Sequence, residues 1–372
     1  MQPSASSPTP STRRPPSPAP TAVGPDLRIK IGQMLLVGFR GTSVDAGSQV
    51  VRDISEHSLG GVVLFDVDMP TRTPSRNVES PDQLRRLVAD LQAAAATTTA
   101  GIPLLVAIDQ EGGQVARLDP DHGFPATESA AQLGARGDSA YTESNATALA
   151  TTLAAAGINL NLAPVVDLDV NPANPIIGEL DRSYSADADV VVEHALAFIR
   201  GHHAAGVRTA LKHFPGHGSA AGDTHAGMVD VTNAWSDVEL VPFARIIDAG
   251  TADAIVTAHV FDATIDADRP ATLSTATING MLRQSLGYDG VVISDDMQMG
   301  AIRDAFGYEE AVALAIEAGV DILTIANQQV FEEGIVARTI EIIGDHVASG
   351  RIEEARIDES HRRIRALKET LG

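Results

Sequence analysis

The chain has 372 residues and carries 49 Asp and Glu against 27 Lys and Arg, a formal net charge of −22. This charge excludes nucleic acid and anionic membranes as general partners, because their phosphates would be repelled. Cysteine is absent, which excludes disulfides and thiolate chemistry. The sequence has no run of about 18 apolar residues that would span a membrane. No predicted strand leads into a GxGxxG or GxxxxGKS/T loop for a nucleotide.

Residues 1–24, MQPSASSPTPSTRRPPSPAPTAVG, are rich in Pro, Ser and Thr and nearly free of large apolar side chains. Such a segment cannot bury a core, so we expect a disordered tail that acts as a tether or spacer. It lacks the apolar h-region of a signal peptide. The tail would suit a secreted or lipid-anchored protein whose signal has been removed, and equally a cytosolic one. The sequence therefore leaves the compartment open.

After the tail, short apolar segments alternate with stretches that have apolar residues at the three- and four-residue spacing of helices. The predicted helices include 81–96, 143–156, 187–205, 238–249 and 309–318, with one or two closing helices in 331–371. The predicted strands are 34–39, 61–65, 103–109, 158–167, 208–213, 254–259, 290–295 and 321–327. This alternation indicates a parallel sheet, and eight units predict an α/β fold, a single-domain (β/α)8 TIM-type barrel over residues 25–372.

Polar and ionisable side chains stand at the carboxyl ends of these predicted strands. They are Asp109, Asp167, Lys212, His213, His259, Asp295 and Asn327. TIM barrels place their active sites on the face formed by the carboxyl ends of the strands. We therefore expect these side chains to surround one site.

The densest group of ionisable side chains is KHFPGHGSAAGDTH at 212–225, whose glycine and proline content argues against a helix. His225 follows Asp223 by two residues, so the carboxylate can orient the imidazole as a proton shuttle near neutral pH. Two alternatives are an ordinary surface turn and a metal site built from His213, His217 and His225. The metal site has little support, because Pro-Gly separates the first two histidines and no HExxH motif accompanies them.

A second segment rich in carboxylates, GVVISDDMQMGA at 290–301, runs from an apolar strand into Asp295 and Asp296. Side chains alternate along a strand, so adjacent carboxylates point in different directions. One can face the barrel axis while its neighbour caps the next helix, or both can cap that helix. The register of the strand decides between these arrangements. We expect Met297 and Met299 to serve in packing.

With these motifs in order, the chain resembles the bacterial β-N-acetylglucosaminidases of glycoside hydrolase family 3. The resemblance rests on KHFPGHG with the Asp-Thr-His after it and on the later Ser-Asp-Asp, and it extends from about residue 29 onward. It also includes IDQEGGQVARL at 108–118, LNLAPVVDLDVNP at 160–172, NPIIG at 174–178, RSY at 182–184 and TAHV at 257–260. The chain departs from the family pattern in the three residues Glu-Leu-Asp between Gly178 and Arg182.

The resemblance implies catalytic roles for three residues: Asp295 as nucleophile, His225 as general acid/base and Asp223 as its orienting partner. It implies sugar binding in the first subsite by Asp109, Arg117, Arg182, Lys212 and His213. A retaining glycosidase needs a carboxylate to trap the oxocarbenium-like centre and a proton donor for the leaving oxygen, here an imidazole. We also expect Asp167 to pair with the cations of this set, and His217 and His259 to support the site.

The expected protein is a monomeric, exo-acting, retaining β-N-acetylhexosaminidase. It removes terminal N-acetylglucosamine from carbohydrate substrates, here expected to be peptidoglycan fragments, without a metal or cofactor. Broader glucosidases of the family add a second α/β domain that bears the acid, for which residues 25–372 leave no room. Three alternatives stay open: a β-N-acetylglucosaminide phosphorylase on the same scaffold, a metal-dependent barrel hydrolase, and a non-catalytic sugar-binding protein.

Overall fold

The computed structural model describes residues 24–97 and 102–371, so the predicted tail lies outside the described residues except for Gly24. Eight parallel strands form one sheet in the order β11-β9-β7-β6-β3-β2-β1-β12. Ile293 bridges Ile322 in parallel, and the Ser294 N–H donates to the Ile322 carbonyl at 2.8 Å, which closes β11 onto β12. The predicted TIM-type α/β barrel is therefore confirmed.

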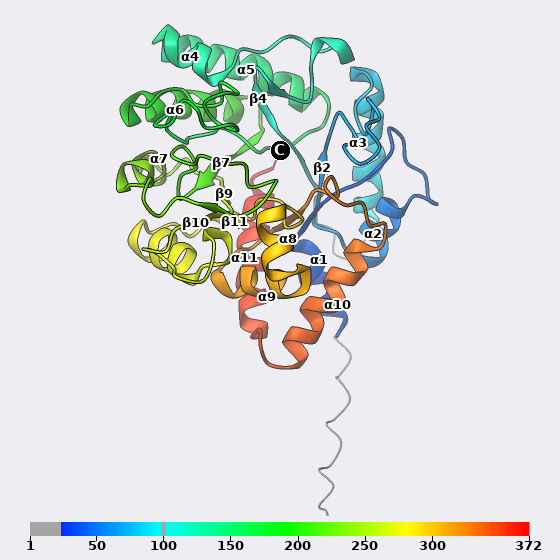
Figure 1. Cartoon of the computed structure of the whole chain (residues 1–372). Helices are drawn as coiled ribbons and strands as arrows, with labels where there is room; N and C mark the ends of the chain where they lie inside the picture. The colour runs from blue at the N-terminus through cyan, green and yellow to red at the C-terminus, as the bar shows by residue number, and fades with distance from the viewer. Residues whose placement is uncertain (1–23, 98–101, 372) are drawn as a thin grey trace, which may run out of the picture.

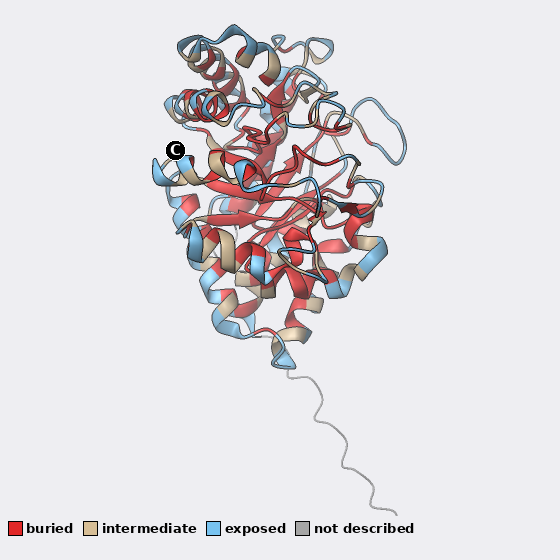
Figure 2. Cartoon of the chain, turned by 60° about the vertical axis from the view of Figure 1, so that its left-hand side comes forward, coloured by how far each residue is buried: buried red, intermediate tan, exposed pale blue. Residues whose placement is uncertain are grey.

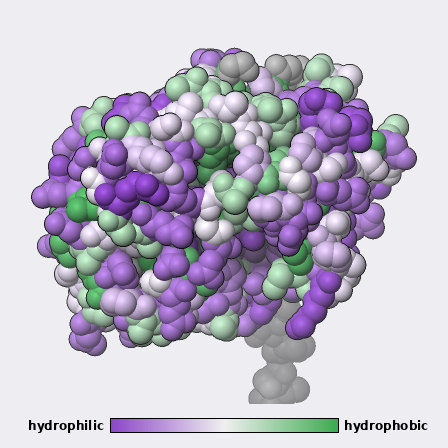
Figure 3. Space-filling view, turned by 90° about the horizontal axis from the view of Figure 1, so that it is seen from above, coloured by the Kyte–Doolittle hydropathy of each residue, from purple (hydrophilic) through white to green (hydrophobic). Residues whose placement is uncertain are grey.

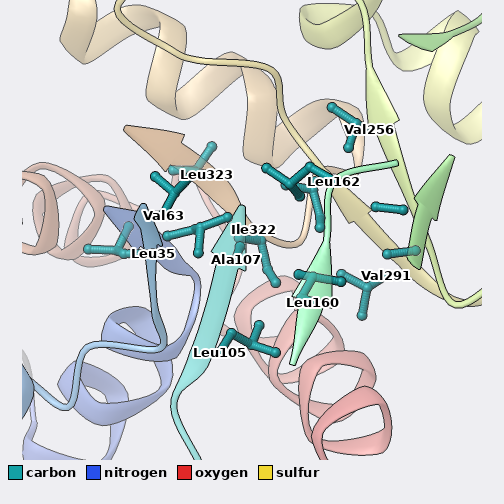
Figure 4. Close-up of a cluster of buried hydrophobic side chains, with 14 of the residues drawn as sticks. Leu35, Val63, Leu105, Ala107, Leu160, Leu162, Val256, Val291, Ile322 and Leu323 are labelled. Carbon is teal, nitrogen blue, oxygen red and sulfur yellow. The ribbon is translucent and has the colours of Figure 1, made fainter. Parts of the chain in front are cut away.

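All eight predicted strands occur, most of them shorter than expected. They are β1 (Leu35–Gly38), β2 (Gly61–Leu64), β3 (Leu105–Ile108), β6 (Leu160–Asn161), β7 (Arg208–Phe214), β9 (Ala254–Thr257), β11 (Val291–Ile293) and β12 (Leu323–Ile325). Their apolar side chains, among them Leu105, Leu160, Val256 and Val291, meet in a buried cluster (Figure 4). This packed interior is the rigid platform on which the carboxyl-end side chains stand.

Helices surround the sheet, with their buried sides facing the strands (Figures 1 and 2). The α-helices are α1 (Pro25–Gln33), α2 (Gln49–His57), α3 (Pro81–Ala96), α4 (Ala130–Arg136), α5 (Ser139–Ala155), α6 (Ala188–Ala204), α7 (Val241–Asp248), α8 (Gly300–Phe306), α9 (Tyr308–Ala318), α10 (Ile335–Ala348) and α11 (Glu354–Glu369). The π-helix η4 (Ala276–Ser285) and the 3-10 turns η1 (Pro120–His122), η2 (Asp237–Leu240) and η3 (Ala271–Leu273) complete the set.

Local sequence accounts for the helices that were predicted. In α3, Ser80 and Gln83 form a capping box, and Leu84, Leu87, Val88 and Leu91 follow at helical spacing and are buried. The sequence pattern did not predict α1, α2, α4, α8 or η4. Of these, α4 and α8 have only seven residues each, too few to establish a periodic pattern.

Two small strand pairs extend the carboxyl face of the barrel. The hairpin of β4 (Gln110–Gly112) and β5 (Val115–Ala116) follows β3 directly. The parallel pair of β8 (Val229–Asp230) and β10 (Val260–Phe261) covers a second apolar cluster that includes Val231 and Trp235. These pairs support the loops that carry the candidate site residues.

The surface seen in Figure 3 is largely hydrophilic, with apolar residues scattered over it. Within 24–97 and 102–371, no helix combines the length and the apolar character needed to cross a membrane.

Candidate active site

Asp295 stands just beyond the end of β11, at the carboxyl face as predicted. Its Oδ1 accepts a hydrogen bond from the Asp296 N–H at 2.8 Å. Burial alone would raise the pKa of this carboxyl, but the nearby imidazoles of His259, His213 and His225 outweigh it and lower the pKa to about 2. The site therefore holds an ionised carboxylate with three histidines around it.

The Asp296 side chain points away from the Asp295 side chain. The two adjacent carboxylates therefore face different directions, as one of the two predicted arrangements requires. Asp296 Oδ1 accepts the N–H of Gln298 at 3.1 Å and the N–H of Ala326, just beyond β12, at 3.0 Å. Burial raises the pKa of Asp296 to about 6. The expectation that it caps the next helix is wrong: α8 begins only at Gly300, and its N-cap residue, Met299, makes no side-chain cap.

The predicted acid/base pair is present as a hydrogen-bonded unit. His225 Nδ1 lies 2.6 Å from Asp223 Oδ1, and the same oxygen accepts the backbone N–H of His225 at 2.8 Å. An ionised carboxylate can only accept, so Nδ1 carries a proton and Nε2 is left to exchange one. The His225 side chain is 53% exposed, which keeps Nε2 accessible at the mouth of the barrel.

Lys212 lies in a buried cluster of charges at the end of β7. Its Nζ is 2.6 Å from Asp109 Oδ1 and 2.7 Å from Glu111 Oε1. Burial alone would lower the pKa of Lys212, but these two carboxylates outweigh it and raise the pKa. The ammonium stays charged at the base of the site, with Asp109 partly accessible beside it.

Arg182 pairs with Glu111 through two hydrogen bonds of 2.8 Å each. Burial would raise the pKa of Glu111, but the charges of Arg182 and Lys212 hold it well below its usual range. The three residues between Gly178 and Arg182 form a turn, in which Asp181 adopts φ 56° and its N–H donates to the Gly178 carbonyl at 3.0 Å. The departure from the family pattern therefore still leaves the guanidinium at the site.

Arg117 approaches the site from the segment after β5. Its Nη1 lies 3.6 Å from Asp66 Oδ1, and its Cζ lies 5.7 Å from the centroid of the Phe65 ring. Its Nε is buried and has no hydrogen-bond partner within the protein. Arg117 is thus held by weak contacts.

Asp167 binds the histidine loop, and the expectation that it pairs with Arg117, Arg182 or Lys212 is wrong. Its Oδ2 lies 2.7 Å from His213 Nδ1, and its Oδ1 accepts the His217 N–H at 2.8 Å. Burial would raise the pKa of Asp167, but its contacts with His213 and His217 lower it. Arg182 and Lys212 pair with Glu111, which the β4–β5 hairpin places between them, and Arg117 lies beside Asp66.

His217 and His259, expected to support the site, are both buried. His259 Nε2 lies 3.0 Å from the carbonyl oxygen of Asp296, so this nitrogen carries the proton and donates to the backbone beside Asp295. The His217 ring packs edge-on against His213, with ring centroids 5.8 Å apart, and burial lowers its pKa to about 4. Met297 and Met299 are buried in packing roles, as expected.

Two carboxylates that lie among these residues, Glu111 and Glu239, were not predicted from the sequence. Glu111 pairs with both Arg182 and Lys212. Its position two residues after Asp109 was the sequence feature that could have indicated this role. Glu239, in η2, is buried, and its Oε2 accepts the N–H groups of Gly218 at 2.9 Å and Ser219 at 3.3 Å. Nothing local marks Glu239, because it reaches the loop only through the tertiary fold.

The predicted alternative of a histidine metal site is not supported by the geometry. Among the residues that the structure describes, no group of three or more His, Asp or Glu side chains is arranged to hold a metal ion.

The family model of the glycosyl hydrolase family 3 N-terminal domain matches residues 26–367. The chain belongs to glycoside hydrolase family 3. A β-hexosaminidase from Xylella fastidiosa is 38% identical over 311 residues, which cover 82% of this chain and 86% of the relative. The predicted resemblance is confirmed, and this family 3 chain is a glycosidase of the β-hexosaminidase type.

Solved structures of family 3 agree with the fold. A β-N-acetylhexosaminidase from Beutenbergia cavernae has a TM-score of 0.82 at 35% identity, covering 92% of this chain and 98% of that one. A β-N-acetylglucosaminidase from Paenibacillus has a TM-score of 0.83 at 38% identity, covering 92% of this chain but 62% of that one. The chain likewise spans 54% of the length of β-hexosaminidase A from Pseudoalteromonas piscicida, to which it is 34% identical.

Proposed function

We propose that this protein is a retaining exo-β-N-acetylhexosaminidase that releases terminal N-acetylglucosamine from peptidoglycan fragments. The observation that carries the proposal is the pairing of an ionised carboxylate, Asp295, with an accessible imidazole, His225, that Asp223 orients. The names of the Paenibacillus and Beutenbergia relatives support the acetamido sugar as the substrate class.

In the first step, Asp295 attacks the anomeric carbon and forms a glycosyl ester. His225 gives its Nε2 proton to the leaving glycosidic oxygen, and Asp223 stabilises the imidazolium that donates it. In the second step, neutral His225 removes a proton from water, which attacks the same carbon and releases the sugar with retained configuration. The low pKa of Asp295 suits this role, because a nucleophile has to be ionised when the sugar arrives.

The charge cluster is proposed to hold the terminal sugar. Asp109 accepts hydrogen bonds from hydroxyls, while Lys212 and Arg117 donate to oxygens. Arg182 and His213 complete the set, each fixed by a carboxylate on its far side. Fixed donors and acceptors recognise a hydroxyl pattern at little entropic cost, which favours one sugar at the chain end.

A fluorinated N-acetylglucosaminyl donor with a good leaving group tests this mechanism. Fluorine slows both steps through the oxocarbenium-like transition state, and the good leaving group lets the first step proceed. We expect a covalent glycosyl-enzyme that peptide mass spectrometry assigns to Asp295. An adduct on another residue, or no adduct during turnover, would contradict the assignment.

The natural substrate is tested separately with defined muropeptides and chitooligosaccharides of matched length. We expect free N-acetylglucosamine from both and a higher kcat/KM on muropeptides. The same reactions run in phosphate buffer should give free sugar. N-acetylglucosamine 1-phosphate as the main product would favour the phosphorylase alternative, and a preference for chitooligosaccharides would contradict the proposed substrate.

A further inference from the structure

The loop that carries His225 is fastened to the first turn of α8. The Gly300 N–H donates to the His225 carbonyl at 3.1 Å, and the Ala301 N–H donates to the Thr224 carbonyl at 3.2 Å. The first N–H groups of a helix have no partner inside the helix. Here the two loop carbonyls satisfy them, so the backbone of His225 is tied to a helix end.

This contact depends on the absence of a side chain at residue 300. A Cβ built on Gly300 would lie 2.8 Å from the His225 carbonyl oxygen and 3.0 Å from both the carbonyl carbon and oxygen of Ala226. Its φ angle is not positive, so the backbone conformation itself would accept any residue. Glycine is required at this position for close approach of two backbones.

The same short segment leads back to Asp295. The Met297 N–H donates to the Thr324 carbonyl at 2.9 Å, and the Met299 N–H donates to the Asp296 carbonyl at 3.0 Å. Asp296 adds its bond to Ala326. The path from Asp295 to Gly300 is therefore held against β12, and α8 starts at a defined place relative to the carboxylate.

The loop that carries His225 is also held near its two ends. Asn171 Nδ2 donates to the Ala220 carbonyl at 2.9 Å, and Val229 pairs with Val260. His225 lies between these anchors and is exposed, so α8 is the support next to the histidine itself.

We propose that Gly300 is a positioning residue, through which α8 holds the His225 backbone at a set distance from Asp295. The inference rests on the proposed function, which makes these two side chains the proton donor and the nucleophile. A displacement of about 1 Å in a catalytic group can cost about 100-fold in rate, so the contact is expected to act on catalysis.

The test is Gly300→Ala, assayed on aryl N-acetylglucosaminides with a poor and a good leaving group. We expect kcat/KM to fall about 10- to 100-fold with the poor leaving group, which needs a proton, and to stay near wild type with the good one. Hydrolysis of the glycosyl-enzyme also slows, because water needs a base. Azide needs none: it attacks the anomeric carbon, the ester to Asp295 breaks, and turnover recovers as the β-glycosyl azide.

Three further variants complete the design. Gly334→Ala adds the same methyl group where nothing lies within 4 Å, and it should match wild type in every assay. Ala301→Pro removes the N–H donated to Thr224 in a first helical turn, which tolerates proline, and should resemble Gly300→Ala if that variant folds poorly. His225→Ala serves as the reference for loss of the acid/base group.

The variants distinguish failure of the positioning role from failure of the acid/base assignment. Wild-type kinetics in Gly300→Ala, or equal loss with both leaving groups and no azide rescue, would overturn the positioning role while His225→Ala still showed its leaving-group dependence. If His225→Ala lacked that dependence, the acid/base assignment would fall and the inference with it.

Discussion

Asp295 and Asp296 are neighbours in the chain, yet their surroundings give them opposite pKa shifts. Imidazoles outweigh burial at Asp295, and its pKa falls to about 2. At Asp296 burial outweighs two backbone N–H donors, and its pKa rises to about 6. The first carboxylate is suited to attack carbon, and the second ties the loop after β11 to β12.

Asp295→Ala is predicted to lower kcat on an aryl N-acetylglucosaminide by at least about 1000-fold, because no other group can form the glycosyl ester. Asp296→Asn should keep most activity, since the amide oxygen can still accept the N–H groups of Gln298 and Ala326. Steady-state kinetics of the two variants is the measurement. Equal losses at both positions would contradict the division of roles.

At the scale of elements, the β4–β5 hairpin decides how the buried cations Arg182 and Lys212 are arranged. It carries Glu111 inward from the end of β3, where the carboxylate meets both Arg182 and Lys212. A buried ion cluster of this kind loses stability when one member is removed, because the others are left as unpaired charges.

Glu111→Gln is therefore predicted to lower the free energy of unfolding by about 3–5 kcal/mol and to weaken catalysis. The matched control is Glu128→Gln, which breaks an exposed pair with Arg136 at 3.0 Å and should change stability little. Urea denaturation and kcat/KM check both variants. If the two variants behaved alike, the hairpin carboxylate would have no special role.

At the scale of the whole molecule, α11 packs across the end of the barrel opposite the site and buries a lysine there. Lys368 Nζ donates to Gln33 Oε1 and to the Gly60 carbonyl, each at 2.7 Å, which links α11 to α1 and to the start of β2. No carboxylate accompanies these contacts among the described residues, and burial lowers the pKa of Lys368 from 10.5 to about 7.

A lysine whose pKa is lowered on folding binds its proton more weakly in the folded state than in the unfolded state. Between about pH 7 and 10.5 the unfolded chain holds more protons, so the Lys368 contribution to stability increases as pH rises. Lys368→Met should lack this increase, and Lys30→Met, which removes an ion pair with Asp358, should keep it. The free energy of unfolding is measured by urea denaturation at pH 7 and pH 9.5. An equal change with pH in wild type and Lys368→Met would contradict the prediction.

Much of this protein could be predicted from local pattern alone. Eight apolar segments and the helical spacing between them predicted the barrel, because burial on both faces of a parallel strand leaves a mark within a few residues. The motifs around Asp295 and His225 also predicted which side chains gather at the carboxyl face. That followed because a parallel barrel brings all its strand ends to one side.

Tertiary structure decided which carboxylates pair with which histidines and cations. Strand register selected Asp295 over Asp296 to face the histidines, and the hairpin after β3 put Glu111, where Asp167 was expected, between Arg182 and Lys212. The contact of Gly300 with His225 joins segments far apart in the chain. Such pairings depend on distances across the folded barrel, and a periodicity that repeats every two or 3.6 residues carries no information about them.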